Sequence, residues 1–314
     1  MGDHDGLFKL GFGEAIHAAG ELRSVLPPAI LDAIALEELE RVAGSFVDED
    51  LAQRHTDLLF RAPRRDTGEP LYLYVLIEHQ SEPDRWMPMR VLGYVLRIWE
   101  TLLRDEVLRH LPPIVPLVVH HGAGGWSAPR SLHDLVHGLD ELPALRPFVP
   151  ALHLIIDDLV TASDADLQAR PLAPFQQLVL WFLRDVRRPE RFVTGLHAWD
   201  SLVRALEAVD DSLLLTALQY LREFAGPGPF EVFRRRIIDL APSQENLMIS
   251  AAQFDFDRGV EKGLRGTLAT LLAQRFGPLD DETQAWIARA AAPRLERALA
   301  RLLTAPTVTA VLDE

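Results

Sequence analysis

Two carboxylates and one amide stand where predicted strands begin and end. Asp57 begins the strand-like run 57–62, Glu78 follows the apolar run 71–77, and Gln80 comes two residues later. If the two runs pair as an antiparallel hairpin, both carboxylates lie at the same edge of the sheet. Residues i and i+2 of an extended chain point to one face about 6.5 to 7 Å apart, so the Gln80 amide reaches the same place as Glu78.

This group of side chains fits a magnesium site. Mg²⁺ prefers oxygen ligands and keeps positions for water and for a substrate phosphate. The bound ion can lower the pKa of a water molecule and stabilise the charge that develops in phosphodiester hydrolysis. A carboxylate beside a buried strand is costly unless it is paired or metal-bound. The structural alternative is that Glu78 caps a neighbouring helix or pairs with Arg90.

The elements around these residues predict a mixed α/β sheet with helices on its faces, because the chain runs helix, strand, strand, helix, strand. The run 71–77 is apolar on both faces, which is typical of a central, doubly covered strand. The loop between the first two strands has the Pro, Asp and Gly of a hairpin turn. The predicted helices cover 7–40 and 87–104, and the predicted strands cover 57–62, 71–77, 114–121 and 151–159.

The second half of the chain is predicted to be helical, since strand patterns stop after about residue 165 and GPGP at 226–229 is a clear break. The tail from 259 has the pattern of three short amphipathic helices, separated by GPLDD and by AAAPR. We therefore predict one domain over 1–235, with its core at about 1–165 and a helical part at 166–235. A helical C-terminal domain is predicted over 236–314.

Composition narrows the class of protein. The chain has 314 residues, of which 48% are hydrophobic, so it can bury a sizeable core. It has no cysteine, so any metal must be held by oxygen or imidazole ligands. The formal net charge of -14 argues against a protein that coats nucleic acid non-specifically. Without a signal peptide or a long apolar run, we expect a cytoplasmic protein that does not enter membranes.

Three further features invite functional interpretations. Arg90, Arg97 and Arg104 recur at heptad spacing on the predicted helix 87–104 and could contact a phosphate backbone, although such a face is usually only solvated. His120 and His121 are adjacent on a strand and therefore point to opposite faces, which favours structural roles over one shared metal ion. GAGGW at 122–126 lacks the lysine of a phosphate-binding loop and is interpreted as a turn.

Four segments carry a family likeness: HDGLFKLGF (4–12), HTDLLFRA (55–62), YVLIEHQSEPDRWMPMRVLGYVLRIWE (74–100) and LPPIVPLVVHHG (111–122). They resemble the Rpn, or YhgA-like "putative transposase", family of recombination-promoting nucleases, which belongs to the PD-(D/E)XK nuclease superfamily. The likeness covers about residues 4–230, and the tail from about 258 resembles a small helical domain of unknown function. It implies a PD-(D/E)XK restriction-endonuclease-like mixed sheet core flanked by helices, with an all-helical C-terminal extension.

The resemblance also implies roles for single residues. Asp57 would be the first-strand acid that binds the metal, Glu78 the second acid, and the backbone carbonyl of His79 a further ligand. Gln80 takes the place of the superfamily's lysine, and since it carries no positive charge, activation of the attacking water would depend more on the metal. An acid from the first helix often completes such sites, and Asp5 matches that position.

Glu14 is a weaker match for that first-helix acid.

The function that the resemblance implies is a Mg²⁺-dependent DNA endonuclease, with Mn²⁺ as a substitute, that promotes recombination or belongs to mobile elements. DNA would be its partner, contacted through Arg90, Tyr94 and Arg97, and a homodimer stays open. A second hypothesis is a catalytically degenerate, DNA- or protein-binding regulatory module. A genuine transposase is a remote third, because no third acid of a DDE-type site is evident.

Overall fold

A computed structural model describes residues 4–42, 58–78, 83–105, 110–122 and 124–312. The chain divides into two compact units, Met1–Gln244 and Glu245–Glu314. The division falls later than the predicted boundary at 235, because helix α11 (Pro227–Leu240) continues past that residue. Its Ile237 is fully buried, and Gln244 donates a hydrogen bond from Nε2 to the Leu206 carbonyl at 3.4 Å. These contacts hold the segment up to residue 244 in the first unit.

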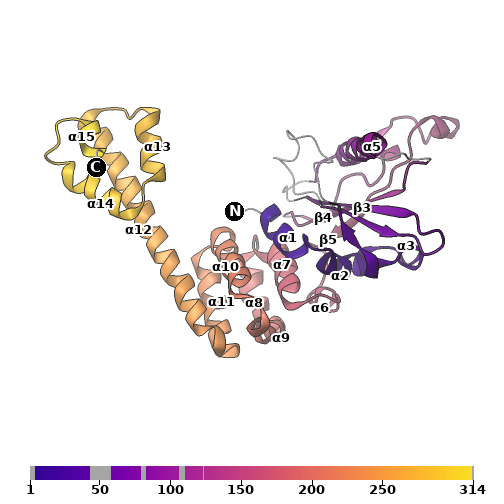
Figure 1. The fold of residues 1–314 in the computed structure, drawn as a ribbon, viewed down its shortest axis with the longest axis horizontal. Coiled ribbons are helices and arrows are strands. Elements are labelled where there is room, and N and C mark those ends of the chain that lie inside the picture. The colour runs from indigo at the N-terminus through magenta and orange to yellow at the C-terminus, as the bar shows by residue number, and fades with distance from the viewer. Residues whose placement is uncertain (1–3, 43–57, 79–82, 106–109, 123, 313–314) are drawn as a thin grey trace. The chain divides into compact units, whose positions relative to one another are not determined.

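The centre of the first unit is a five-stranded mixed sheet in the order β1-β2-β3-β4-β5 (Figure 1). The first three strands are antiparallel, whereas β3, β4 and β5 run parallel. This confirms the predicted mixed α/β sheet and the predicted hairpin, although the last strand is shorter than the predicted 151–159. The strands are β1 (Glu40–Arg41), β2 (Leu58–Pro63), β3 (Pro70–Glu78), β4 (Ile114–His120) and β5 (Ile155–Asp158).

The hairpin between β2 and β3 turns through a short loop. Gly68 has a φ of 71°, which lies in the left-handed region that favours glycine. The backbone N–H of Arg64 donates to the Glu69 carbonyl at 2.8 Å and closes the turn. In the resulting register Leu58 lies opposite Val75, and Pro63 lies opposite Pro70. The start of β2 therefore lies at the edge of the sheet toward which β3 runs.

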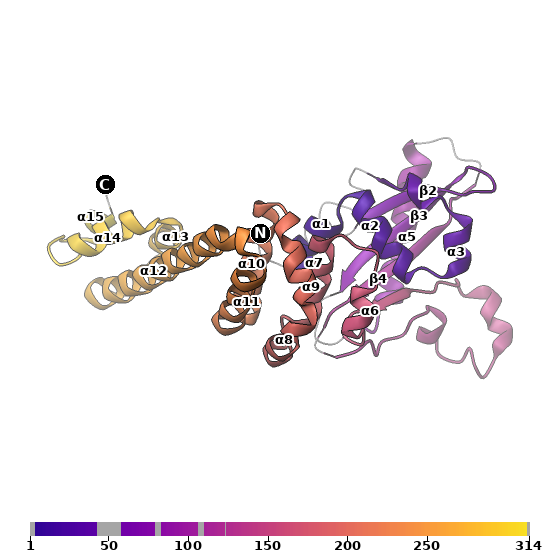
Figure 2. The same ribbon diagram turned by 90° about the horizontal axis from the view of Figure 1, so that it is seen from below.

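Helices cover both faces of the sheet, which explains why β3 is apolar on both sides. Helix α5 (Met87–Asp105) lies on one face, and α1 (His4–Phe12) and α2 (Ala15–Val25) lie on the other (Figures 1 and 2). The short helix α3 (Pro28–Ala33) follows α2. Because side chains alternate along a strand, the two faces have separate buried contacts. Tyr72, Tyr74 and Val118 pack with α5, whereas Phe60, Val75 and Leu117 line a small apolar cavity with Phe8, Phe12 and Leu22.

The rest of the first unit is helical, as predicted. Its core contains stacked aromatic rings, with Trp181 and Trp199 at a centroid distance of 4.7 Å and an interplanar angle of 9°. Phe192 also stacks on Trp181, at a centroid distance of 4.9 Å. Helix α10 ends at Gly226, the first residue of the GPGP break, whose φ is 87°. These helices are α6 (Asp164–Gln168), α7 (Pro174–Asp185), α8 (Pro189–Gly195), α9 (Asp200–Ala205), α10 (Asp211–Ala225) and α11.

The second unit is all-helical, as predicted, but its first helix was not expected. Helix α12 (Glu245–Phe276) is continuous over 32 residues, whereas the sequence pattern predicted a short helix starting near residue 259. The missed part, 245–258, contains several residues of lower helix propensity, such as Phe, Ile and Asp, which explain the difference. The predicted turns occur after α12 and between α13 (Asp281–Arg289) and α14 (Ala292–Arg301), which α15 (Val308–Leu312) follows. Their shared core includes Leu268, Leu272, Ile287, Leu295, Ala298 and Val311.

One buried group of charges ties β5 to the helices on the α1 side of the sheet. Arg170 donates two hydrogen bonds to Asp157 of β5, each of 2.8 Å, and another to Glu21 of α2. All three side chains are at least nine-tenths buried. Burial, together with the negative charge of Asp157, raises the pKa of Glu21 well above its usual range. Two acids thus share one guanidinium.

The raised pKa of Glu21 predicts a dependence of stability on pH. The unfolded state loses this proton near 4.5, the ordinary value, while the native state keeps it to higher pH. The free energy of unfolding therefore falls as pH rises above 4.5 toward the raised pKa. Glu21→Gln, which can still accept the hydrogen bond from Arg170, is expected to remove that fall. Urea denaturation of both proteins from about pH 5 to about pH 8 measures it.

Glu37→Gln is the matched control for this measurement. A hydrogen bond from Arg65 lowers the pKa of Glu37, so its contribution to stability changes only below the ordinary pKa of 4.5. The difference between this variant and wild type should be constant over the measured range. If the curve for Glu21→Gln also runs parallel to that of wild type, the assignment of a raised pKa to Glu21 is wrong.

Candidate active site at the carboxyl edge of the sheet

Three strand ends meet at one edge of the sheet. Because β3, β4 and β5 are parallel, their carboxyl ends share that edge. The register aligns Glu78 with His120, and His120 with Asp158. The predicted hairpin is confirmed, so β2 begins at this edge as well.

Most of the predicted catalytic and metal-binding residues lie outside the residues that the structure describes. Asp57, His79 and Gln80 lie outside the described residues, and only the backbone of Glu78 is described. Their roles as metal ligands and as water-orienting groups stay predictions. Within the described part of the chain, no three His, Asp or Glu side chains lie together in a way that could hold a metal ion.

The first helix reaches the same edge. The ring of His4 lies 4.7 Å, centroid to centroid, from the ring of His121, which directly follows β4. Asp5, the next residue of α1, is 9% exposed. Glu14 lies past the other end of α1, where its side chain is 81% exposed and comes within 4.0 Å of His17. The structure thus separates the two first-helix acids, and it brings only the segment with Asp5 to the carboxyl ends of the strands.

His4 is held by two polar partners in a buried aromatic setting. Nη2 of Arg187 donates to His4 Nε2 at 2.8 Å, and His4 Nδ1 is hydrogen-bonded to the Tyr220 hydroxyl. Since a guanidinium can only donate, Nε2 carries the lone pair and Nδ1 carries the proton of a neutral ring. Phe224 lies at 4.3 Å from the imidazole, and burial raises the pKa of Tyr220 well above its usual range. Residues after α7 and on α10 thereby fix the start of α1.

His120 and His121 point to opposite faces of the sheet, as predicted. His121 faces α1, whereas His120 contacts Trp126 edge to face at 5.4 Å on the α5 side. Nε2 of His120 donates to the Gly124 carbonyl at 2.9 Å. The backbone N–H of Trp126 donates to Asp158 Oδ2 at 2.8 Å. The loop after β4 therefore closes over the ends of β4 and β5.

Gly125 allows this loop to approach β5 closely. A Cβ atom at this position would lie 3.2 Å from Asp158 Oδ2 and 3.2 Å from Thr161 Cγ2. Both contacts are tighter than ordinary van der Waals packing. Sequence reasoning identified the loop as a turn but missed Asp158, whose signal was an acid at the carboxyl end of a predicted strand.

The proposed phosphate contacts on α5 occupy different environments. Arg90 donates from Nη1 to Asp84 Oδ2 at 2.9 Å. Tyr94 is buried, and its ring lies 5.7 Å from that of Tyr74 in the core beneath the helix. Arg97 is half-buried, and Arg104 is exposed and donates to Thr101 at 3.0 Å. DNA contact by Arg90, Tyr94 and Arg97 stays a prediction.

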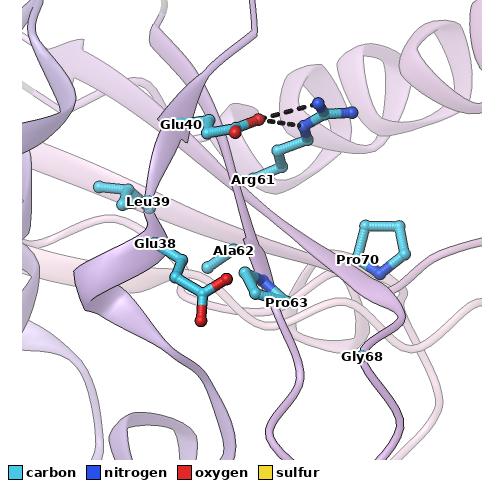
Figure 3. A pocket seen from close by; sticks show the side chains of 8 residues that line it. All are labelled: Glu38, Leu39, Glu40, Arg61, Ala62, Pro63, Gly68 and Pro70. Atoms are coloured by element: carbon cyan, nitrogen blue, oxygen red, sulfur yellow. Dashed lines mark hydrogen bonds and ion pairs between the residues drawn. The ribbon is translucent and has the colours of Figure 1, made fainter.

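A groove of about 580 Å³ lies elsewhere, at the other edge of the sheet (Figure 3). It is bordered by the amino end of β3, the carboxyl end of β2, and β1. Its acid Glu40 accepts hydrogen bonds from Arg61 at 2.8 to 2.9 Å, as Figure 3 shows. Both side chains are half-exposed or more, so this ion pair contributes little to stability. Glu38 also lines the groove, so its two acids lie at the opposite ends of the strands from Glu78.

Comparison with known proteins gives one family and several relatives. The sequence model of the family described as "Putative transposase, YhgA-like" matches residues 2–213. Recombination-promoting nuclease RpnD of Escherichia coli O157:H7 is 27% identical over 250 residues, which are 80% of this chain and 92% of the relative. RpnA of E. coli K12 is 27% identical over 279 residues, 88% of this chain and 91% of the relative. No solved structure matches.

Some relatives are named as inactive proteins. The protein named "Inactive recombination-promoting nuclease-like protein RpnE", from E. coli K12, is 26% identical over 250 residues, 80% of each chain. Separately, none of the helices in the described ranges is long and apolar enough to cross a membrane.

The hydrogen bonds of His4 predict a measurable contribution to stability. His4→Phe keeps the ring packing but removes the acceptor for Arg187 and the partner of Tyr220, so it should lower the free energy of unfolding by about 1–3 kcal/mol. Tyr220→Phe removes one of these bonds and should cost about 0.5–1.5 kcal/mol. Urea denaturation provides both values.

His17→Phe is the control for the same substitution on α2, where the imidazole is partly exposed and 4.0 Å from Glu14. Its effect should stay within about 0.5 kcal/mol. A loss for His4→Phe no larger than that of His17→Phe would show that the polar contacts of His4 do not hold the start of α1.

Proposed function

Because the chain belongs to the YhgA-like "putative transposase" family, we propose that it is a metal-dependent DNA endonuclease that hydrolyses phosphodiester bonds. The observation that carries the proposal is the shared carboxyl edge of β3, β4 and β5, where β3 ends at Glu78 and α1 begins with His4 and Asp5. The names of RpnD and RpnA support a nuclease that promotes recombination. A role in mobile elements is part of the same proposal.

The residues proposed for this edge match the ligand preference of Mg²⁺, which takes carboxylate and carbonyl oxygens. Asp57, Glu78 and the backbone carbonyl of His79 would hold the ion, and Asp5 would complete the oxygen donors from the first helix. Mn²⁺, which accepts the same ligands, would replace it. When bound, the ion supplies a water of lowered pKa and stabilises the charge on the phosphate.

Gln80 would orient the attacking water without changing its charge. A side-chain amide carries one acceptor oxygen and two N–H donors, so it can hold a water and a phosphate oxygen. It cannot take a proton from the water, unlike a neutral lysine amine. The buried strand β3 is the rigid element that would hold these groups in place, since it is paired on both sides and covered on both faces.

The DNA backbone would run along α5. Arg97 is half-buried and Arg90 is anchored by Asp84, and both lie on the helix that follows β3 in the chain. Planar guanidinium groups bind phosphate through two parallel hydrogen bonds. Tyr94 lies beneath them in the core and would support the helix that carries both arginines.

A degenerate nuclease that acts as a DNA- or protein-binding regulatory module is the second candidate. The similarity to RpnE, which is named inactive, favours it, together with glutamine at position 80 and the net charge of -14. The two candidates differ in metal binding. Calorimetric titration with Mg²⁺ and Mn²⁺ should show binding that is lost in Asp57→Ala if the chain is a nuclease, and no Asp57-dependent binding if it is a degenerate module.

Removal of Glu78 tests the nuclease directly. Cleavage of supercoiled plasmid DNA in Mg²⁺ should fall at least about 100-fold in Glu78→Ala, because a metal ion contributes several kcal/mol of transition-state stabilisation. Glu141→Ala, which removes an exposed acid in the loop after β4, is the matched control and should cleave like wild type. Equal cleavage by wild type and Glu78→Ala would remove Glu78 from the mechanism.

Salt dependence tests the phosphate contact of Arg97. When a variant neutralises one phosphate fewer on duplex DNA, the slope of log K against log salt should decrease in magnitude by about 0.9. We expect this change for Arg97→Gln, measured by fluorescence anisotropy without divalent ions. Arg235→Gln on α11, where the arginine is 73% exposed and paired with Glu231, should leave the slope unchanged. Identical slopes for wild type and Arg97→Gln would exclude the contact.

A further inference from the structure

We propose that His120 and Asp158 form a cation site of their own, which binds a divalent ion that accepts an imidazole nitrogen, such as Mn²⁺. Neither residue belongs to the oxygen ligands proposed for Mg²⁺ above. The two lie side by side at the ends of β4 and β5, in the same register position. The inference goes beyond DNA cleavage, because it concerns the binding of the ion alone.

The hydrogen bonding of His120 uses one ring nitrogen and leaves the other available to bind a metal ion. The side chain is fully buried, and its Nε2–H donates to the Gly124 carbonyl at 2.9 Å. Nδ1 of the neutral ring therefore carries a lone pair. This atom is buried and has no hydrogen-bond partner among the residues that the structure describes. Metal-binding histidines are held in this way, with the second ring nitrogen donating to a backbone carbonyl.

The carboxylate of Asp158 likewise has one hydrogen-bonded oxygen and one available oxygen. Its Oδ2 accepts the backbone N–H of Trp126 at 2.8 Å, which fixes the carboxylate plane. Its Oδ1 is buried and, in the described ranges, has no partner either. A carboxylate with one anchored and one available oxygen is the usual arrangement of a metal ligand.

Both available atoms belong to the α5 side of the sheet. The Trp126 ring contacts His120 at 5.4 Å on that side, and the backbone of Trp126 binds Asp158. Adjacent parallel strands lie about 4.8 Å apart, so the two side chains are direct neighbours. Two buried acceptors at one register position, on one face of the sheet, need a donor or a cation, because an unsatisfied buried polar atom is costly.

The pair also indicates which ions would bind. Mg²⁺ prefers an all-oxygen shell, whereas imidazole suits Zn²⁺, Cu²⁺, Fe²⁺ and Ni²⁺, and Mn²⁺ serves as the paramagnetic probe of such a site. One nitrogen and one carboxylate oxygen leave several coordination positions of the ion for water. The buried indole Nε1–H of Trp126 would donate a hydrogen bond to one of these water molecules. This indole nitrogen also lacks a partner within the described residues. A site of this composition should bind Mn²⁺ more tightly than Mg²⁺.

Pulsed electron paramagnetic resonance of Mn²⁺ bound to the full chain tests the proposal without DNA. We expect a nitrogen coupling from one imidazole in wild type and its loss in His120→Ala. His121→Ala is the matched control, because His121 points to the opposite face against His4, and it should keep the coupling. Asp158→Asn retains an acceptor for the Trp126 N–H and should weaken Mn²⁺ binding by about 10–100-fold.

Circular dichroism establishes that each variant folds, and His120→Gln replaces His120→Ala if the alanine variant does not. Absence of bound Mn²⁺, bound Mn²⁺ without nitrogen coupling, or a coupling that survives loss of His120 would overturn the proposal. The result is separate from that of the proposed nuclease, since cleavage is measured on Glu78→Ala and the coupling is measured on ions in the absence of DNA.

Discussion

The parallel alignment of β3, β4 and β5 is the constraint on which the rest of the structure depends. Parallel strands need crossover connections, and these connections place α5 on one face of the sheet and the loop 121–154 beyond β4. With α1 and α2 on the other face, β3 is enclosed and must be apolar on both sides. The alignment also brings the carboxyl ends of three strands to one edge, so polar residues far apart in sequence become neighbours there. The helical part of the first unit holds the start of α1 at that edge. There His4 contacts Arg187 and Tyr220 of the helical part and the ring of His121 after β4.

Local patterns in the sequence were sufficient for the hairpin, for α5 and for the apolar strands β3 and β4, because each depends on the alternation or helical period of neighbouring residues. The positions of His120 and Asp158 beside each other could not be predicted, since they follow from a register between strands separated by a long loop. The opposite directions of His120 and His121 were predicted from strand geometry alone. The continuity of α12 was missed because 245–258 contains several residues of lower helix propensity, such as Phe, Ile and Asp.

The fold around Asp57, Glu78 and Gln80 agrees with the sequence-based prediction, whereas the chemical roles of these residues stay proposals. The hairpin that was expected to bring Asp57 and Glu78 to one edge exists, and the edge itself is built from three parallel strand ends. Family membership and the names of the relatives make nuclease chemistry the best-supported proposal for that edge. The buried pair His120 and Asp158 adds polar groups to the same edge that the family resemblance did not assign.

Because Gly125 lies close to Asp158, the residue type that the loop accepts at position 125 depends on the residues at the end of β5. A side chain at position 125 would press on the carboxylate and on Thr161, each at 3.2 Å from its Cβ. A side chain there therefore requires Asp158 and Thr161 to move by a few tenths of an ångström, and a smaller residue at the end of β5 would relieve the contact. We expect these two positions to change as a pair over evolutionary time, even though a long stretch of chain separates them.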